Sequence, residues 1–260
     1  SNITWNAYNN FGGRSNYIHP AALPATPTVN ARLELHRYTD PDHINYKVHD
    51  YHPLSFDRPE PINHIPEDEA VTDPIEGRAA CHVAPTEWRL LGWLEREGFS
   101  YDFFGETQLH SGVLDLDQYR VLMISTHPEY WSSDMYFKVK NWVFEQGGRL
   151  IYLGGNGLNC DVEFIDEQTC IYRNDDERKL VNKTTASVFE SRFHIRQESE
   201  AQLLGVVYDA RGIMTAAPYQ VVESTNWVFE GTGLRDGDCF GTRTQHERVP
   251  GGASGHETDK

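Results

Sequence analysis

A histidine and a glutamate stand two residues apart in residues 126–130, between a short apolar run and the start of a helical pattern. In an extended segment His127 and Glu129 face the same way, so the pair could act as acid and base or bind a metal. Alternatively, Glu129 caps the following helix and His127 packs in the core. Spacing alone leaves both readings open.

Two further polar segments carry candidate groups. Asn156 lies among glycines in residues 154–157. Its amide either stabilises the turn or donates a hydrogen bond into a cleft. His256 and Glu257 form a second histidine–glutamate pair inside a glycine-rich stretch, residues 248–259, and the alternative for that stretch is a solvated tail.

Four tyrosines in the N-terminal part of the chain are further candidates. Tyr8 and Tyr17 stand on either side of a polar loop that contains the paired glycines 12 and 13, and Tyr46 and Tyr51 flank His49. Buried tyrosines mostly belong to cores, but a phenolate oxygen is also a hard anionic ligand suited to ferric iron. Other chemistries lack their signatures. There is no HExxH pair for zinc and no GxSxG for a serine nucleophile, and residues 126–129 hold no cysteine.

The elements that position these groups form a strand–helix–strand unit. Residues 121–124 are a short apolar run typical of a strand buried on both faces, and residues 150–153 are a second one. Between them, Ser132 or Ser133 is suited to cap a helix that stops at glycines 147–148. Such a unit is a right-handed parallel crossover, so the loops after both strands leave the same sheet edge, where open α/β sheets bind ligands.

The rest of the chain extends this pattern. We expect strands at residues 3–8 and 99–104 and a helix at 86–98, which together predict an α/β fold with a flavodoxin-like, mostly parallel sheet and helices on both faces. Residues 18–85 are rich in proline and polar groups and read as a loop-rich insertion. In the C-terminal half a β-rich excursion is expected from short strands at residues 185–188, 203–208, 220–223 and 227–229. We interpret residues 1–260 as a single α/β catalytic domain cut from a longer chain.

Composition excludes several classes of function. The formal net charge of −16 argues against a nucleic-acid groove or an anionic membrane surface as partner. No apolar run approaches the roughly 18 residues that a membrane span needs. The four cysteines are scattered without a CxxC pair, which favours a reduced, cytoplasmic protein.

Five motifs in order resemble one known family. They are WNAYNNFGGRS (5–15), SFDRP (55–59), HPEYW (127–131), GGN (154–156) and GHETD (255–259). Together they resemble the C-terminal domain of the large (β) subunit in the N,N-dimethylformamidase family, over nearly the whole chain. That domain is related in fold to class I glutamine amidotransferase-like proteins, whose cysteine nucleophile is missing here.

The resemblance implies an iron-dependent amidohydrolase that converts N,N-dimethylformamide, or a related small amide, to dimethylamine and formate. It implies a mononuclear non-haem Fe(III) with Glu129, Tyr8 and a second tyrosine as ligands. Tyr51 is the first choice for that second tyrosine, and Tyr46 is the alternative.

The same resemblance implies that His127 and Asn156 orient water or substrate and that Glu257 is the general base. Phe11, Phe104 and Trp131 are expected to contact the substrate's methyl groups. A small partner subunit and homo-oligomerisation are also implied. The competing hypothesis is a non-catalytic or carbohydrate-related α/β binding domain, since this fold class hosts many functions, and a metal analysis separates the two.

Overall fold

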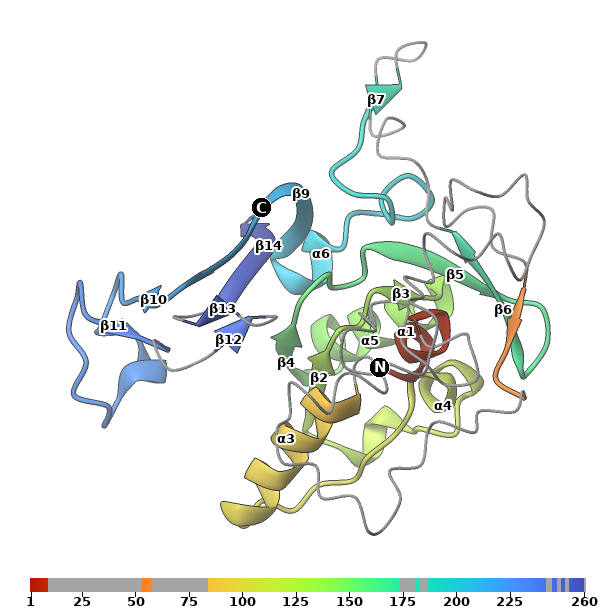
Figure 1. Cartoon of the computed structure of the whole chain (residues 1–260). Helices are drawn as coiled ribbons and strands as arrows, with labels where there is room; N and C mark the ends of the chain where they lie inside the picture. The colour runs from red at the N-terminus through yellow and green to blue at the C-terminus, as the bar shows by residue number, and fades with distance from the viewer. Residues whose placement is uncertain are drawn as a thin grey trace, which may run out of the picture. The chain divides into compact units, whose positions relative to one another are not determined.

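The structure is a computed structural model of the 260-residue chain (Figure 1). It describes residues 1–8, 53–57, 84–173, 181–182, 187–241, 245–246, 249–250 and 253–259. For some of these, including Tyr8 and residues 253–259, it describes only the path of the backbone. The described residues group into two compact units, one formed by Ser1–Tyr208 with Thr258–Lys260, the other by Asp209–Glu257. The single-domain organisation stays a prediction.

The predicted strand–helix–strand unit is confirmed. Strands β2 (Val121–Thr126) and β4 (Arg149–Gly154) are parallel neighbours, in register from Val121 opposite Arg149 to Thr126 opposite Gly154. Helix α5 (Ser133–Phe144) connects them, and the Ser132 hydroxyl caps it by accepting from the Met135 N–H. Both strands therefore end at one edge, as expected.

A second, four-stranded sheet stands beside this pair, in the order β1-β6-β5-β3. Its strands are β1 (Leu54–Ser55), β3 (Tyr130–Trp131), β5 (Cys160–Phe164) and β6 (Thr169–Arg173). β3 and β5 run parallel, whereas β5 with β6 and β6 with β1 are antiparallel. The flavodoxin-like, mostly parallel sheet stays a prediction.

The expected strand at residues 3–8 is wrong, because this segment is helix α1 (Asn2–Tyr8). Ile3 and Ala7, four residues apart, are both buried, so the apolar positions have the helical period and not the alternation of a strand. The helix packs against α4 (Glu106–Ser111), β1 and β3.

Two more expected strands are also wrong. Residues 99–104 form an irregular connection, and Phe99 and Phe103 are largely exposed there. Residues 227–229 form a 3₁₀ turn, η8 (Trp227–Phe229), because the Asn226 side chain accepts from the Val228 N–H and caps it. Residues 203–208 are half correct: α6 (Ala201–Leu204) stops at Gly205, and β9 (Val206–Ala217) begins after it.

The predicted helix at 86–98 is confirmed as α3 (Ala84–Arg96), which is followed by Gly98 in the left-handed region. Among the described residues, no helix combines the length and apolar character needed to cross a bilayer. The remaining elements are η6 (Leu116–Gln118), β7 (Val181–Asn182), β8 (Ser187–Val188), β10 (Tyr219–Gln220), β11 (Cys239–Phe240), β12 (Gln245–His246), β13 (Val249–Pro250) and β14 (Ala253–Asp259).

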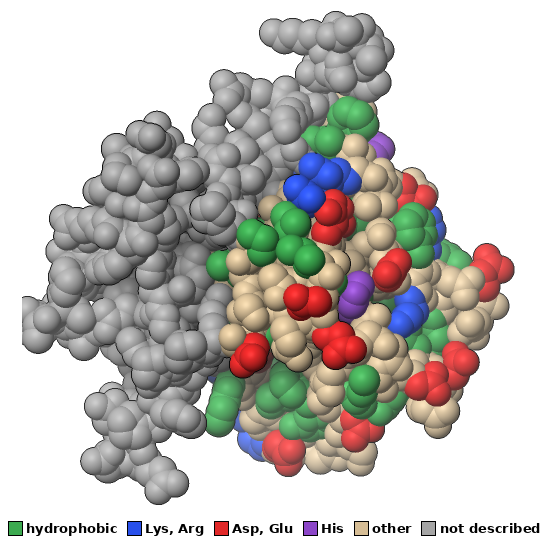
Figure 2. Space-filling model, turned by 90° about the vertical axis from the view of Figure 1, so that its right-hand side faces the viewer, with side chains coloured by type: hydrophobic (Ala, Val, Ile, Leu, Met, Phe, Trp, Pro, Cys, Tyr) green, Lys and Arg blue, Asp and Glu red, His purple; other side chains and the backbone are tan. Residues whose placement is uncertain are grey.

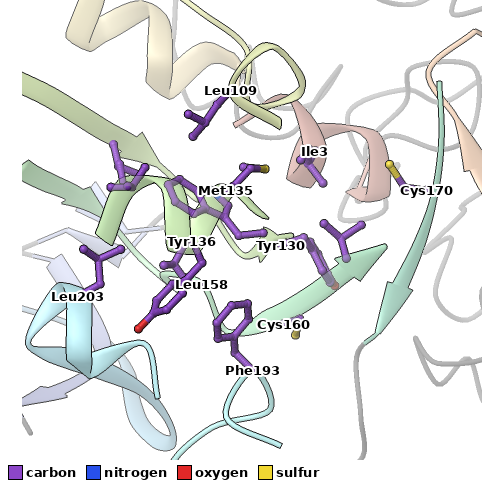
Figure 3. Close-up of a cluster of buried hydrophobic side chains, with 14 of the residues drawn as sticks. Ile3, Leu109, Tyr130, Met135, Tyr136, Leu158, Cys160, Cys170, Phe193 and Leu203 are labelled. Carbon is purple, nitrogen blue, oxygen red and sulfur yellow. The ribbon is translucent and has the colours of Figure 1, made fainter. Parts of the chain in front are cut away.

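A hydrophobic core joins both sheets of the first unit (Figure 3). Ile3 from α1, Met135 from α5 and Tyr130 from β3 meet there, all 1% exposed or less. Burying each such side chain stabilises the fold by about 1.5–3 kcal/mol. The described part of the surface in Figure 2 carries many acidic side chains, in keeping with the negative net charge.

Candidate functional site

The two loops after β2 and β4 are joined by backbone hydrogen bonds. The Gly155 N–H donates to the Thr126 carbonyl (3.1 Å), and the Leu158 N–H donates to the Pro128 carbonyl (2.8 Å). The edge that ends both parallel strands is therefore one continuous structure, which positions the polar groups of both loops.

The loop after β4 is held in a strained path. A Cβ at Gly154 would meet the Thr126 carbonyl oxygen at 2.8 Å, so only glycine fits there. Asn156 (φ 55°) and Leu158 (φ 52°) both adopt the left-handed region, which costs a residue with a side chain about 1–3 kcal/mol. Leu158 is completely buried, and its packing offsets that cost.

His127 and Glu129 form a contact within the first loop. The His127 Nδ1 lies 2.9 Å from the Gly155 carbonyl oxygen, and since a carbonyl only accepts, Nδ1 carries the proton. The His127 Nε2 lies 3.3 Å from the Glu129 Oε2. Because Nδ1 carries the ring proton, Nε2 is the ring nitrogen that can accept a further proton beside this carboxylate.

The two side chains differ in access to solvent. The His127 side chain is 21% exposed and that of Glu129 only 4%. The ring thus reaches the surface, while the carboxylate beside it is enclosed. The alternative reading, in which Glu129 caps the next helix, is wrong because Ser132 caps α5.

Helix α1 is attached to the same loop. The Glu129 N–H donates to the Thr4 hydroxyl at 3.0 Å, and Thr4 is fully buried. Position 8 lies one helical turn beyond Thr4 on the same helix face. Tyr8 therefore lies on a helix, not the expected strand, and this helix is hydrogen-bonded to the Glu129 backbone N–H.

The structure describes the positions of some of the other predicted site residues and not of others. Asn156 lies in the turn, and its carbonyl accepts from the Asn159 N–H (3.4 Å). Glu257 lies in β14, within the range of the second unit, and β14 pairs with β9. Tyr46 and Tyr51 lie outside the described residues.

Three residues were expected to contact the methyl groups of the substrate. Phe104 and Trp131 are described, and Phe11 lies outside the described residues. Trp131 is buried, and its indole N–H donates to the Glu106 carboxylate at 2.9 Å. Phe104 and Trp131 both line an apolar cavity of about 200 Å³. They therefore share one cavity, which is bounded by α3, α4 and β2.

Of the expected iron ligands, Glu129 is the one whose side chain the structure describes. No cluster of three or more histidine, cysteine, aspartate or glutamate side chains suited to a metal occurs in the described part of the chain. The expected set, however, is one carboxylate and two phenolates, and only the carboxylate belongs to a described side chain. Glu129 is an enclosed carboxylate that a nearby cation would stabilise, and the iron-ligand set stays a prediction.

Cys160 and Phe193, which the sequence did not mark, form hydrogen bonds with the segments that follow β2 and β4. The Cys160 N–H donates to the Glu129 carbonyl at 2.9 Å, and the Phe193 N–H donates to the Asn159 carbonyl at 2.8 Å. Burial, together with the nearby Glu129 charge, raises the pKa of the Cys160 thiol well above its usual range. Cys160 is therefore a thiol and not a thiolate nucleophile. No pattern in the sequence marked it, because these contacts join segments that are distant in the chain.

The chain matches known proteins along its length. The sequence pattern of the family described as "N,N-dimethylformamidase beta subunit-like, C-terminal" matches residues 1–260. Two proteins named N,N-dimethylformamidase beta subunit, from Alcaligenes sp and Paracoccus aminophilus, are 26% and 24% identical to it over 211 residues, 71% of this chain. The aligned region is 26% of the length of each relative. The chain belongs to the N,N-dimethylformamidase β-subunit-like C-terminal family.

Proposed function

We propose that the chain carries the active site of an amidohydrolase that cleaves a small N-substituted amide, N,N-dimethylformamide or a related compound, to an amine and formate. The relatives are named for dimethylformamide, which motivates the substrate class. The observation that carries the proposal is the His127–Glu129 contact, held against the Gly155 carbonyl at the end of two parallel strands. Such an edge is where α/β proteins assemble their sites.

The roles of the chain's own residues follow from this geometry. The bond from Nδ1 to Gly155 fixes the His127 ring, so that Nε2 can hold or release a proton beside Glu129 or a bound water. Asn156, in the same turn as Gly155, supplies an amide to orient substrate. Glu257 is proposed as the base that takes the proton from the attacking water and returns it to the leaving amine.

We further propose that Tyr8, Glu129 and Tyr51 hold a mononuclear ferric ion, with Tyr46 as the alternative to Tyr51. When bound, a ferric ion polarises the amide carbonyl and acidifies water. The enclosed carboxylate of Glu129 and the hydrogen bond from its N–H to α1 support this assignment.

A partner subunit belongs to the same proposal. The relatives are named as β subunits, so we propose that the complete protein works with a smaller subunit and as an oligomer. The segment described here would then supply catalytic groups and not the whole assembly.

The test is to assay the full-length protein, loaded with iron, against N-alkylated formamides while measuring bound iron. Hydrolysis with release of formate and an amine is expected. Loss of activity in His127→Asn with iron retained would support the assigned role. A protein that binds no metal and cleaves none of the amides would contradict the proposal and favour a non-catalytic domain.

A further inference from the structure

The cavity beside Trp131 is apolar, and the charged side chains that line it are acidic. Its volume is about 200 Å³, more than ten times the roughly 10–15 Å³ that one water needs. Among its described lining residues none is a lysine, arginine or histidine, and the carboxylates belong to Glu87, Asp102 and Glu106. Apolar side chains from α3, α4 and β2 form much of the remaining wall, namely Leu90, Leu91, Leu94, Leu109, Leu122 and Ile124.

The carboxylate of Glu106, the first residue of α4, is held in a fixed direction. Its Oε1 accepts from the Trp131 indole N–H at 2.9 Å, and its Oε2 accepts from the Ile3 N–H at 3.1 Å. Each oxygen keeps a further lone pair for a ligand. Burial raises the pKa of the Glu106 carboxyl, and the nearby Glu87 charge also raises it. A bound cation would oppose both effects and favour the ionised form.

The other acidic groups of the cavity differ in their partners. Asp102 is exposed and already accepts from the Tyr119 hydroxyl at 2.8 Å. Glu87 accepts from the backbone nitrogen of Ser1. In a chain that continues before Ser1, this nitrogen is a peptide N–H, which offers a hydrogen bond but no positive charge. In such a chain, no cationic side chain of the described lining neutralises Glu87 or Glu106.

Aromatic rings complete the wall of the cavity. Phe104, Tyr119 and Trp131 line it, and the rings of Phe104 and Tyr119 meet edge to face with their centroids 6.0 Å apart. Aromatic faces attract cations, and alkylated ammonium ions are recognised by rings in this way. A divalent metal ion would need several more oxygen ligands, and an uncharged apolar ligand would leave enclosed carboxylates without a counter-charge.

The cavity reaches the candidate site. Ser125, which lines it, precedes His127 by two residues, and Trp131 follows Glu129 by two. Ser1 also lines the cavity and connects the two regions. Its hydroxyl donates to the Ser125 carbonyl at 2.7 Å and accepts from the His127 N–H at 3.4 Å. A small molecule that leaves the edge loop therefore has this cavity as its neighbour.

We propose that the cavity binds a small alkylammonium ion, with its N–H groups on Glu87 and Glu106 and its alkyl groups against the aromatic and leucine side chains. The identification of this ion as the amine product rests on the proposed amide hydrolysis. Water cleaves the C–N bond of the amide to give formic acid and an amine. The acid loses its proton to the amine, which is protonated at neutral pH like the lysine side chain.

The experiment measures binding of dimethylammonium chloride to the wild-type full-length protein, loaded with iron, by saturation-transfer NMR. We expect a dissociation constant of about 1 mM, near the limit for a ligand of about three non-hydrogen atoms. Two comparison ligands compete against it: 2-propanol, which has no charge, and ammonium, which has no methyl groups. Each should bind at least about tenfold more weakly, because it lacks either the ion pair or the buried methyl groups.

Variants of the cavity carboxylates test the mode of binding. Glu106→Gln keeps an acceptor for the Trp131 indole but removes the charge, and it should weaken binding by about 10- to 100-fold. Glu87→Gln, on α3, should weaken binding in the same direction and serves as a second variant if Glu106→Gln does not fold. Glu97→Gln is the matched control. It removes the same charge just after α3, where the carboxylate pairs with Arg96 at 3.2 Å on the surface, and it should bind like the wild type.

The outcomes separate this inference from the proposed function. Dimethylammonium should slow formate release by the wild type at millimolar concentration and slow it less in Glu106→Gln. Hydrolysis without dimethylammonium binding, or with equal binding by wild type and both cavity variants, would overturn the inference and leave the amidohydrolase standing. Equal binding of 2-propanol would also overturn it, because the cavity would then be selective for apolar groups alone.

The converse result is equally informative. If the protein hydrolyses no amide but binds dimethylammonium, and Glu106→Gln weakens that binding, the alkylammonium site stands and the proposed hydrolysis fails. A wild type that neither binds dimethylammonium nor cleaves an amide overturns both.

Discussion

The His127 Nε2 and the Glu129 Oε2 lie 3.3 Å apart, while the opposite ring nitrogen of His127 is bonded to the Gly155 carbonyl. The ring can therefore neither rotate away from the carboxylate nor lose its Nδ1 proton without breaking a hydrogen bond. This arrangement joins the loop after β2 to the loop after β4 through one side chain.

Replacing His127 by asparagine should lower kcat by about 10²–10⁴-fold, the typical contribution of a positioned acid–base group. Folding should be retained, because the ring is part of an edge loop and the core lies elsewhere. The measurement is steady-state kinetics with a far-ultraviolet CD check. His110→Gln is the matched control, since that ring bonds the Ser132 hydroxyl and stacks on Phe164, and it should alter stability but not kcat. Equal losses in both variants would assign His127 a structural role.

Glu129→Ala should release iron, because this carboxylate is the proposed anionic ligand from the edge loop. The purified wild type should show a visible phenolate-to-iron charge-transfer band, and the variant should lose it together with the metal. Metal content is measured by atomic emission. A variant that keeps full iron and colour would show that another residue is the ligand, and a colourless, fully active wild type would remove the tyrosinate proposal altogether.

Glu257→Gln should keep iron and its colour while losing most of kcat. Three anionic ligands already balance the charge of Fe(III), so a fourth carboxylate is better used as a base than as a ligand. Glutamine preserves size and hydrogen bonding but takes up no proton. Parallel metal analysis and kinetics decide between the roles: loss of iron would make Glu257 a ligand, and unchanged turnover would move the base to His127.

Glu200 should make the fold less stable as pH rises. Burial raises its pKa from 4.5 to about 7, and burial of Asp161 raises that pKa to about 6. Between its unfolded pKa and its folded pKa, each native carboxyl binds more protons than the unfolded one, so the free energy of unfolding falls as pH increases. For Glu200 alone the loss should approach about 3 kcal/mol by pH 8.

Glu200→Gln keeps a group that can bond the Ser191 hydroxyl but does not titrate. Its free energy of unfolding, from denaturant titrations at pH 5 and pH 8, should depend less on pH and exceed the wild-type value at pH 8. Glu198→Gln is the control, because Lys140 lowers the pKa of Glu198 and its charge does not change in this window. An identical pH dependence in wild type and Glu200→Gln would refute this reading.

Alkylation of the native protein should leave turnover intact. Cys239 is exposed, whereas Cys160 and Cys170 are buried, and burial raises the pKa of Cys170 to about 12. Iodoacetamide should therefore modify Cys239 before Cys160 and Cys170, as mapped by mass spectrometry, whereas Cys81 lies outside the described residues. Complete loss of kcat with iron still bound would reveal a cysteine mechanism.

The sequence by itself determined the central unit and the loops that follow it. Short apolar runs flank a helix with a serine cap, and these signals are local, so β2, α5, β4 and the pairing of their ends could be read from pattern. Spacing within one loop allowed the His127–Glu129 contact but left the alternative open, and the structure decided between them.

Only the tertiary structure decided which elements surround that contact. Residues 2–8 form a helix because Ile3 and Ala7 find a buried environment made by segments more than 100 residues away, and local pattern does not carry that information. The hydrogen bond from the Cys160 N–H to the Glu129 carbonyl likewise depends on how β3 and β5 align. Hydrogen-bond satisfaction is a property of the packed chain, so no pattern of residue types along the sequence reveals it.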